Sequence, residues 1–567
     1  MKKHEEEKFM FKRKGLFALL VILIAGLCTS GLALAGPGTV QVQTIGDITI
    51  RMGAQIRLVP TSEINRDFGV SDRLGDTDAQ KAAAKAIWAL GSGILVKTSS
   101  GTFVGAGSES TRAHLNESGG AVKDGYIRGE NRLFFNFAHG QDWDVYMALE
   151  SDTVLDRKSA DRTDWGYGHQ SQQFGIERLL ASFNLPWINS RLEAGWDARG
   201  IDIGYGGIVY GDDDPGIGIK GSAKGFKWQL WYIKKDEDEA GYWDDEYDDT
   251  LYGNPIAGPD QGGDVDRTFY YGILGRTFGV AYLETFLMLD RNYTKSRDID
   301  RYFLGLQGKA TLGIFKPSFE IVYCTGDYDS TSGTDYDINS FAMFADIAMD
   351  LHKVVGIKRF EAHIGGIYAK GDNTPDNGHL SGFAPATGIA RFTPSFGTEQ
   401  SISFDGNQLL GQTLYSILPA YYGTIRGAGI NGGAALNNPG FIMVGGGVKA
   451  GYGRWSYKTN VMAMWYDQTE AVEAYFAWLG QSNTKIDHFM GVEWNNELAY
   501  KLYDSVTLKA GAAFFFPGSG ARDITKAVDA IGQAGASSGD IAASDFNDGR
   551  SSDDVSMRIA AELLWFF

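Results

Sequence analysis

The sequence predicts an all-β fold, a transmembrane antiparallel β-barrel of about 18 strands with short periplasmic turns and long extracellular loops. First, residues 555–567 alternate apolar and more polar side chains, a period of two that is typical of a strand. Second, this stretch exceeds the roughly 9–11 residues that a tilted strand needs to cross a bilayer. Third, similar segments recur along the chain and are joined alternately by few residues and by many.

The amino terminus predicts export. Lys12, Arg13 and Lys14 precede an apolar run over residues 15–27, and small residues follow through Ala35. This order is typical of a secretory signal peptide, and the apolar run is shorter than the roughly 20 residues of a spanning helix. We therefore expect a signal peptide over residues 1–35 and a single barrel domain over residues 36–567. The mature chain then keeps only Cys324, which excludes an internal disulfide.

Segments with a period of two predict eighteen strands, an even number as expected for an antiparallel barrel with both termini at one end. The predicted strands cover residues 48–59, 126–138, 143–152, 174–185, 190–199, 216–222, 226–234, 268–277, 279–290, 301–312, 315–325, 340–351, 357–369, 441–452, 455–467, 487–502, 506–516 and 555–567. The longest connections are residues 60–125 and 370–440, which either fold into the lumen or lie over its mouth.

The strand near residues 455–466 shows how the barrel is expected to sit in a bilayer. Trp455 and Trp465 share one face and are separated by about 33 Å of strand, or about 25 Å of membrane height after tilting. Rings of aromatic side chains at the two membrane interfaces are typical of such barrels. The two tryptophans are therefore expected to lie in opposite rings.

Two other stretches belong to the predicted long loops. Residues 76–90, with alanines behind an acidic start, predict a helix that either narrows the lumen or decorates the surface. Residues 236–266 carry many aspartates and glutamates without a lysine or arginine. Such a run is typical of a solvated loop, although its oxygen ligands also suit Ca²⁺.

Charged side chains recur on the strand face opposite the apolar positions. Because an arginine or lysine facing lipid costs about 2–4 kcal/mol at the bilayer midplane, these residues are expected to line water. The candidate pore-lining residues are Arg51, Arg57, Arg128, Arg132, Arg191, Glu193, Asp197, Arg199, Lys449, Lys458, Glu493, Glu497, Arg558 and Glu562. Further acidic candidates on this face are Glu130, Asp144, Glu150, Asp346 and Asp350.

These charges nearly balance, and they fit equally well a stabilised barrel wall or a role in selectivity. Together with the acidic loop at a mouth, the balance predicts a weak preference for cations.

Several short motifs resemble segments of known barrels. Residues 368–378 read YAKGDNTPDNG, and Tyr323 begins a related Tyr-Cys-Thr-Gly-Asp one hairpin earlier. With the stretch Gly491-Val-Glu-Trp-Asn495, these residues resemble the alginate-export family and the porins near it, which are outer-membrane barrels of Gram-negative bacteria. The resemblance implies a barrel of eighteen strands in contact with outer-membrane lipid and lipopolysaccharide.

The last strand resembles the closing strand that the barrel-assembly machinery reads. This implies that Trp565 and Phe567 form an assembly signal.

The expected function is that of a porin, a water-filled channel for passive diffusion of small hydrophilic solutes or ions. The resemblance implies as an alternative an exporter of an acidic exopolysaccharide, but exporters of alginate have a strongly basic lumen and the candidates here are mixed. A further alternative is the sheath of a porin-cytochrome electron conduit.

We expect no enzyme, no cofactor, no metal site and no nucleic-acid partner. The strongest enzymatic candidate, His379-Leu-Ser381, falls in a predicted loop.

Overall fold

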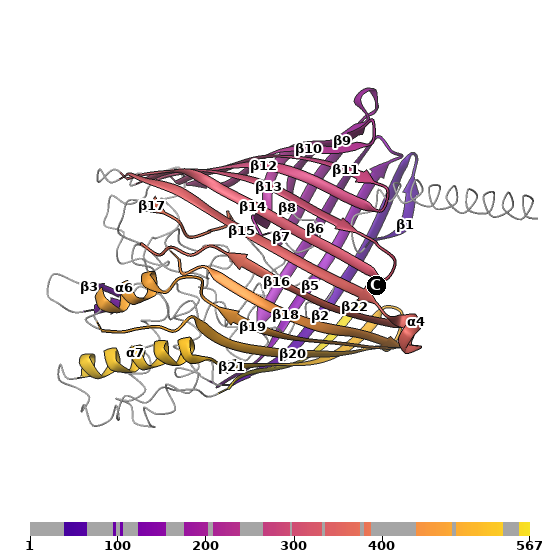
Figure 1. Ribbon diagram of the computed structural model, residues 1–567. Coiled ribbons are helices and arrows are strands. Elements are labelled where there is room, and N and C mark those ends of the chain that lie inside the picture. Colours follow the sequence, from indigo (N-terminus) through magenta and orange to yellow (C-terminus); the bar gives the residue numbers. More distant parts are fainter. Residues whose placement is uncertain are drawn as a thin grey trace, which may run out of the picture.

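The computed structural model describes residues 39–64, 95–97, 103–105, 123–154, 175–201, 208–238, 265–294, 297–330, 335–374, 379–386, 438–478, 483–536 and 555–567. Within these residues the chain forms a closed antiparallel barrel (Figure 1). One sheet contains twenty strands, and eighteen of them, all except β1 and β17, follow one another around the ring. The last strand pairs with β2, which closes the barrel.

The ring strands are β2 (Ile48–Ile64), β5 (Lys123–His139), β6 (Trp143–Val154), β7 (Gly175–Leu185), β8 (Ser190–Ile201), β9 (Tyr210–Ala223), β10 (Phe226–Asp238), β11 (Val265–Phe278), β12 (Ala281–Thr294), β13 (Arg297–Ala310), β14 (Phe315–Ser330), β15 (Asp335–Asp350), β16 (Arg359–Ala369), β18 (Phe441–Tyr452), β19 (Trp455–Trp465), β20 (Phe489–Lys501), β21 (Val506–Pro517) and β22 (Ser556–Phe566). Each coincides with one predicted strand, so the predicted fold class and strand number are confirmed.

The predicted strand ends are wrong mainly at the long-loop end. Strand β9 begins at Tyr210 instead of residue 216, and β14 continues to Ser330 instead of residue 325. Strand β10 likewise runs to Asp238, so the first residues of the acidic stretch are strand and not loop. These extensions are rich in aspartate and lack the apolar alternation, but the ladder of backbone hydrogen bonds continues because a neighbouring strand is still present.

Several small elements were not predicted. They are β1 (Val40–Ile45), β3 (Leu95–Lys97), β4 (Phe103–Gly105), β17 (His379–Leu380), η4 (Pro186–Ile188), α4 (His352–Val355), α6 (Glu470–Trp478) and α7 (Ser519–Ala536). The helix predicted over residues 76–90 lies outside the described residues. Among the described residues, no helix combines the length and the apolar character needed to cross a membrane.

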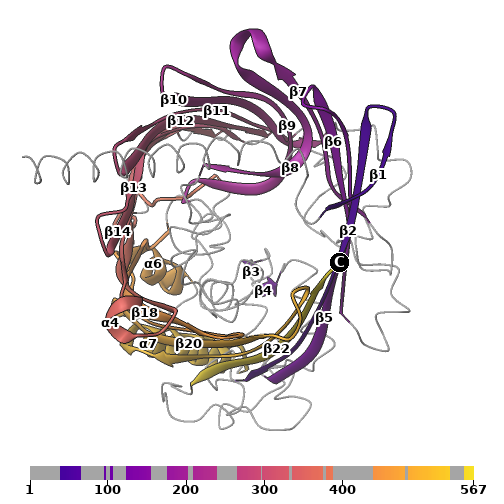
Figure 2. The same cartoon turned by 90° about the vertical axis from the view of Figure 1, so that its right-hand side faces the viewer.

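The two ends of the barrel differ. The short turns, α4 and the carboxyl terminus lie at the right-hand end in Figure 1, whereas α6 and α7 lie at the left-hand end, where the long connections are. The view along the barrel in Figure 2 shows α6, β3 and β4 within the outline of the ring. Structure from the long connections therefore overlies the lumen at the long-loop end.

The outer face of the ring is apolar, as the alternation predicts. Along β15 exposed and buried residues alternate almost without interruption. Aromatic pairs stand at both ends of β19: the ring centroids of Trp455 and Tyr500 are 4.5 Å apart near the short turns, and those of Trp465 and Phe489 are 5.5 Å apart at the other end. The two tryptophans thus lie at opposite ends of the strand.

The inner face is divided. From the end of β8 to β21, buried apolar side chains of the wall form one continuous cluster with residues of inner loops, among them Ile208, Val209 and Phe383. On β5 and β6 the corresponding cluster contains only Phe134, Tyr146 and Ala148 among the described residues. One side of the barrel interior is therefore covered by packed chain, and the other side is mostly charged.

Candidate functional site

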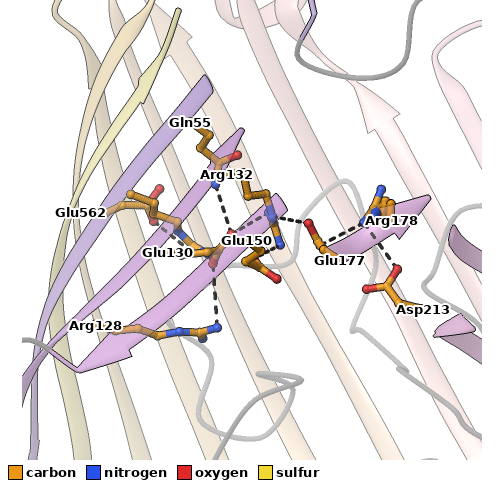
Figure 3. A network of polar contacts seen from close by, with 10 residues as sticks. Gln55, Arg128, Glu130, Arg132, Glu150, Glu177, Arg178, Asp213 and Glu562 are labelled. Atoms are coloured by element: carbon orange, nitrogen blue, oxygen red, sulfur yellow. Dashed lines mark hydrogen bonds and ion pairs between the residues drawn. The ribbon is translucent and has the colours of Figure 1, made fainter. Parts of the chain in front are cut away.

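A continuous charged network lies on the inner faces of β2, β5, β6, β7 and β22 (Figure 3). Arg132 lies at its centre. Its Nη1 is 2.6 Å from Glu130 Oε1, its Nη2 is 2.6 Å from Glu150 Oε1, and its Nε donates to Glu177 Oε2 at 2.9 Å. One guanidinium thus joins carboxylates from three neighbouring strands, which its planar fork of donors allows.

Arg57 extends this charged network across the seam of the barrel. Its Nη1 lies 2.8 Å from Glu130 Oε2, and its Nη2 lies 3.2 Å from Glu562 Oε2 on the last strand. Lys509 approaches the other oxygen of Glu562 at 3.0 Å. The charged network therefore stabilises the pairing of the first and last ring strands.

Arg128 and Arg178 form the outer members of the charged network. Arg128 Nη2 lies 3.9 Å from Glu130 Oε2. Arg178 Nη2 lies 3.6 Å from Glu177 Oε1 and 3.5 Å from Asp213 Oδ1, so it connects the network to β9. Arg178 Nε is also 3.9 Å from Asp197 Oδ1.

The cations and the carboxylates of this wall differ in exposure. The side chains of Arg57, Arg128, Arg132 and Arg178 expose 23 to 26% of their surface. Those of Glu130, Glu150, Glu177 and Glu562 expose between 0 and 12%. Water in the lumen consequently meets guanidinium groups first, with the carboxylates underneath. The order reverses toward the long loops, where Asp213 is more exposed than Arg178.

Other predicted lining residues form smaller groups on the same face. Arg191 pairs with Asp144, and Lys220 lies 2.6 Å from Glu193. Lys458 lies 3.4 Å from Glu497 and is adjacent in register to Lys449. In each of these three ion pairs the cation is again the more exposed partner.

The remaining predicted residues are mostly buried in the wall. Arg199 donates to the backbone oxygens of Asp214 at 2.6 Å and Gly195 at 3.0 Å, and it lies over the ring of Trp231. Glu493 accepts a hydrogen bond from Asn495, and Arg558 is buried on β22. These groups are therefore poorly placed to meet a passing solute.

Three further candidates occupy separate places. Arg51 lies beside Asn136 in register, outside the charged network. Asp346 lies 2.8 Å from Nδ1 of His363, and all of this contact is buried. Asp350 lies at the short-turn end, 3.8 Å from Lys316 Nζ.

The opposite wall holds a group of charges that the sequence did not predict. Asp290 is fully buried and accepts from Arg267 Nε at 3.1 Å and from Arg267 Nη2 at 3.0 Å, and it also pairs with Arg301. Arg267 Nη2 additionally donates to the backbone oxygen of Ala386 at 2.8 Å, and Arg301 Nη1 donates to that of Ala384 at 2.8 Å. The two arginines thus attach residues 379–386, here called the inner segment, to the barrel wall.

Further hydrogen bonds hold the inner segment. The N–H of Phe383 donates to Lys370 O at 2.7 Å, and its carbonyl accepts from Asn438 Nδ2 at 2.8 Å. The N–H of Ala386 donates to Val209 O at 2.9 Å. A buried loop requires such partners for its backbone groups. This part of the 370–440 connection therefore lies against the inner wall.

The Tyr-Ala-Lys-Gly-Asp motif explains how the chain turns inward. Asp467 Oδ2 accepts from the hydroxyl of Tyr368 at 3.2 Å and from the N–H of Gly371 at 2.8 Å. A Cβ at Gly371 would collide with the carbonyl of Pro439, and Gly440 has a left-handed φ of 69° and also touches Gly371. Only glycines allow the two ends of the connection to approach this closely.

Asp372 completes the turn. Its Oδ1 accepts from the N–H of Thr374 at 3.0 Å and from the hydroxyl of Ser381 at 3.2 Å. Burial raises the pKa of the Asp372 carboxyl, and these hydrogen bonds oppose the rise. The hydroxyl of Ser381 is thus engaged with Asp372, whereas His379 contacts Asp337 at 3.4 Å. The two residues of the His-x-Ser pair therefore have different partners.

The sequence missed these residues for identifiable reasons. Arg267 lies just outside the predicted strand 268–277, and Asp290 and Arg301 lie at the ends of theirs. Arg301 has the same parity as the buried Phe303, a signal that could have placed it on the inner face. Glu177 and Arg178 are consecutive residues, but a bulge opposite Ala148 and Leu149 brings both into the charged network.

No family model matches the sequence, and no curated protein matches it. The chain is similar to solved structures of OccK2 (OpdF) from Pseudomonas aeruginosa in complex with glucuronate (9% identity, 91% of this chain and 98% of that chain covered, TM-score 0.42). It is also similar to OccAB2 from Acinetobacter baumannii (9% identity, 91% and 98% covered, TM-score 0.43) and to OpdK from P. aeruginosa with vanillate (10% identity, 91% and 98% covered, TM-score 0.43). At these values the likeness carries no functional argument, and the barrel rests on the strand pairing described above.

Proposed function

We propose that the protein is an outer-membrane channel for passive diffusion of small hydrophilic solutes. The observation that carries the proposal is the closed ring itself, which is apolar on its outer face and charged on part of its inner face. Only helices and closed barrels satisfy their backbone in lipid, and the partly exposed charged side chains on the inner face indicate a lumen that holds water.

The water-filled path runs along the charged wall of β22, β2 and β5 to β8. The opposite wall is covered by packed apolar residues and by the inner segment, which is attached through Arg267 and Arg301. A fixed segment inside the ring narrows it. This favours small solutes over the export of an acidic polysaccharide and over the sheathing of a haem protein.

The arginines along this path give the channel a preference for anions. The near-neutral charge count predicted weak cation preference, but that count treated all charges alike, whereas the carboxylates of the network lie beneath the guanidinium groups. Fixed positive charge at a water-filled surface raises the local concentration of anions.

Reversal potentials across a KCl gradient in planar bilayers test both statements. We expect open-channel conductance with a chloride preference that is largest at low salt, because the Debye length falls from about 10 Å at 0.1 M to about 3 Å at 1 M. An absence of conductance would contradict the channel. Conductance with potassium preference would contradict only the role of the arginines, and a potassium preference that fades at high salt would favour control by the acidic mouth.

Residues 1–35 are proposed to direct export, and Trp565 and Phe567 are proposed to be the signal that the barrel-assembly machinery recognises during membrane insertion. In the membrane, lipopolysaccharide would surround the part of the barrel that lies in the outer leaflet. The rings of Trp565 and Phe567 lie 5.1 Å apart on one face, and Phe566 is paired in register with Gln55. We expect Phe567→Ser to lower the membrane yield much more than Phe566→Ser, measured as heat-modifiable barrel in outer-membrane fractions. Equal yields would contradict the assembly signal.

A further inference from the structure

The short-turn end of the barrel presents apolar side chains at its tips. Six of the short turns expose a large apolar residue: Trp187, Val280, Leu312, Val354, Tyr452 and Tyr503. Val354 is 78% exposed, more than any large apolar residue of the outer wall that the structure describes. A ring of apolar tips is unfavourable in water, which indicates that these tips contact a partner or a membrane.

On β13 the apolar surface of the outer wall continues into the turn without a charged residue, whereas on β11 Arg276 lies over the rings of Phe226 and Phe278 close to the turns. Along β13 and its turn, the outward residues from Tyr302 through Leu304 and Leu306 to Leu312 include no charged side chain. The ten residue steps from Tyr302 to Leu312, the last two of them beyond the end of β13, span about 33 Å of extended chain, or about 25 Å of height at the usual tilt. That height equals the apolar band of an outer-membrane barrel, so the band ends at the turn itself.

The opposite end of the same strands is charged. Beyond Tyr302 and Tyr323, six aspartates face one another on β13, β14 and β15: Asp298, Asp300, Asp327, Asp329, Asp335 and Asp337. Five of the six are exposed, and the less exposed Asp300 is paired with Arg291. Carboxylates at this density cannot lie in hydrocarbon. The ends of β13, β14 and β15 beyond Tyr302 and Tyr323 therefore extend out of the membrane into water at the long-loop end.

The turn tips carry charges of both signs, since the acidic Asp142 and Asp504 are also exposed there. Lys224, Lys353, Lys358 and Arg454 lie in or beside the turns, where long side chains can reach phosphate groups while their stems stay in an apolar layer. Apolar tips combined with lysine and arginine match a phospholipid interface.

We propose that the short-turn rim is inserted into the interfacial layer of the membrane's inner leaflet, so that the barrel has no water-exposed collar at this end. The inference rests on the proposed location in a membrane. Its additional content is the depth of the barrel in the membrane: the short turns contact phospholipid headgroups and not a soluble protein.

Single-cysteine variants of the folded barrel in phospholipid vesicles test this depth. With the buried Cys324 replaced by alanine, a fluorescent label is attached at Val354→Cys at the rim, at Leu304→Cys in the apolar band, or at Asp335→Cys beyond it. We expect brominated lipid to quench the labels at positions 354 and 304 and aqueous iodide to quench the label at 335.

The three positions separate the possible failures. A label at 354 that iodide quenches and brominated lipid does not, with position 304 still in lipid, would overturn the inserted rim and favour a soluble partner for the turns. Loss of lipid quenching at 304 as well would overturn the membrane location itself.

Discussion

The two inner walls of this barrel are built from strands with the same alternation, but their inward positions carry different kinds of side chain. On the charged wall, inward positions carry Arg57, Glu130 and Arg132, and water reaches about a quarter of each arginine side chain. On the covered wall, inward positions such as Phe303 are fully buried against the inner segment. An inward apolar residue is stable only where other chain covers it, so the distribution of inward residues indicates where water runs.

The same difference determines what a lost charge costs. Asp290 is buried completely between two arginines, and removing it takes away the carboxylate that neutralises both of these largely buried charges. The arginines of the charged wall stay partly hydrated, so the loss of one contact there is compensated in part by solvent. Three substitutions compare the walls, in order of decreasing effect.

The largest effect is expected for Asp290→Ala. Loss of the carboxylate shared by Arg267 and Arg301 should destabilise docking of the inner segment by about 3–5 kcal/mol, since it breaks a buried ion pair. Hydrogen exchange should show lost protection of the Phe383 and Ala386 amides, and the channel should conduct more with larger fluctuations. Asp300→Ala is the matched control, because its pair with Arg291 is on the outer face. Unchanged protection in the Asp290 variant would refute the attachment.

An intermediate effect is expected for Arg132→Ala. Three carboxylates then lose a charged donor, which should lower stability by about 1.5–3 kcal/mol and shift the reversal potential toward cations. Arg132→Lys is the control: it keeps the charge but not the fork, so the selectivity should persist while part of the stability is lost. Equal selectivity of the alanine variant and the wild type would exclude this wall from the conducting path.

The smallest effect is expected for Arg128→Ala. Its contact with Glu130 is 3.9 Å long and its side chain is partly exposed, so the stability should change by about 0–1 kcal/mol. The reversal potential should still move in the same direction as for Arg132→Ala, by less. A larger shift than that of the Arg132 variant would place the narrowest part of the path beside Arg128 instead.

The sequence determined the ring well and the interior only in part. Alternation identified every ring strand because lipid outside and water or packed chain inside impose opposite polarities on successive residues. It did not identify the inner segment, because Ala384 and Ala386 bind the wall arginines through their backbone oxygens. Every residue has such an oxygen, so the side-chain pattern does not reveal the contact. The alternation also did not predict the bulge at Glu177, because assigning residues to faces by alternation assumes that the register of the strands is unbroken.

The seam of the barrel sets the order in which this interior can be completed. Arg57 and Glu562 are 505 residues apart in the chain, and both backbone groups of Phe567 bond to Ala54. The entropic cost of so distant a contact grows only slowly with chain length, by about 0.6 kcal/mol per doubling, but the contact cannot form before the final residues are present. The contact between Arg57 and Glu562 therefore forms only after the last strand is present, and a chain truncated before Glu562 would lack this carboxylate beneath Arg57 however well its other strands had paired.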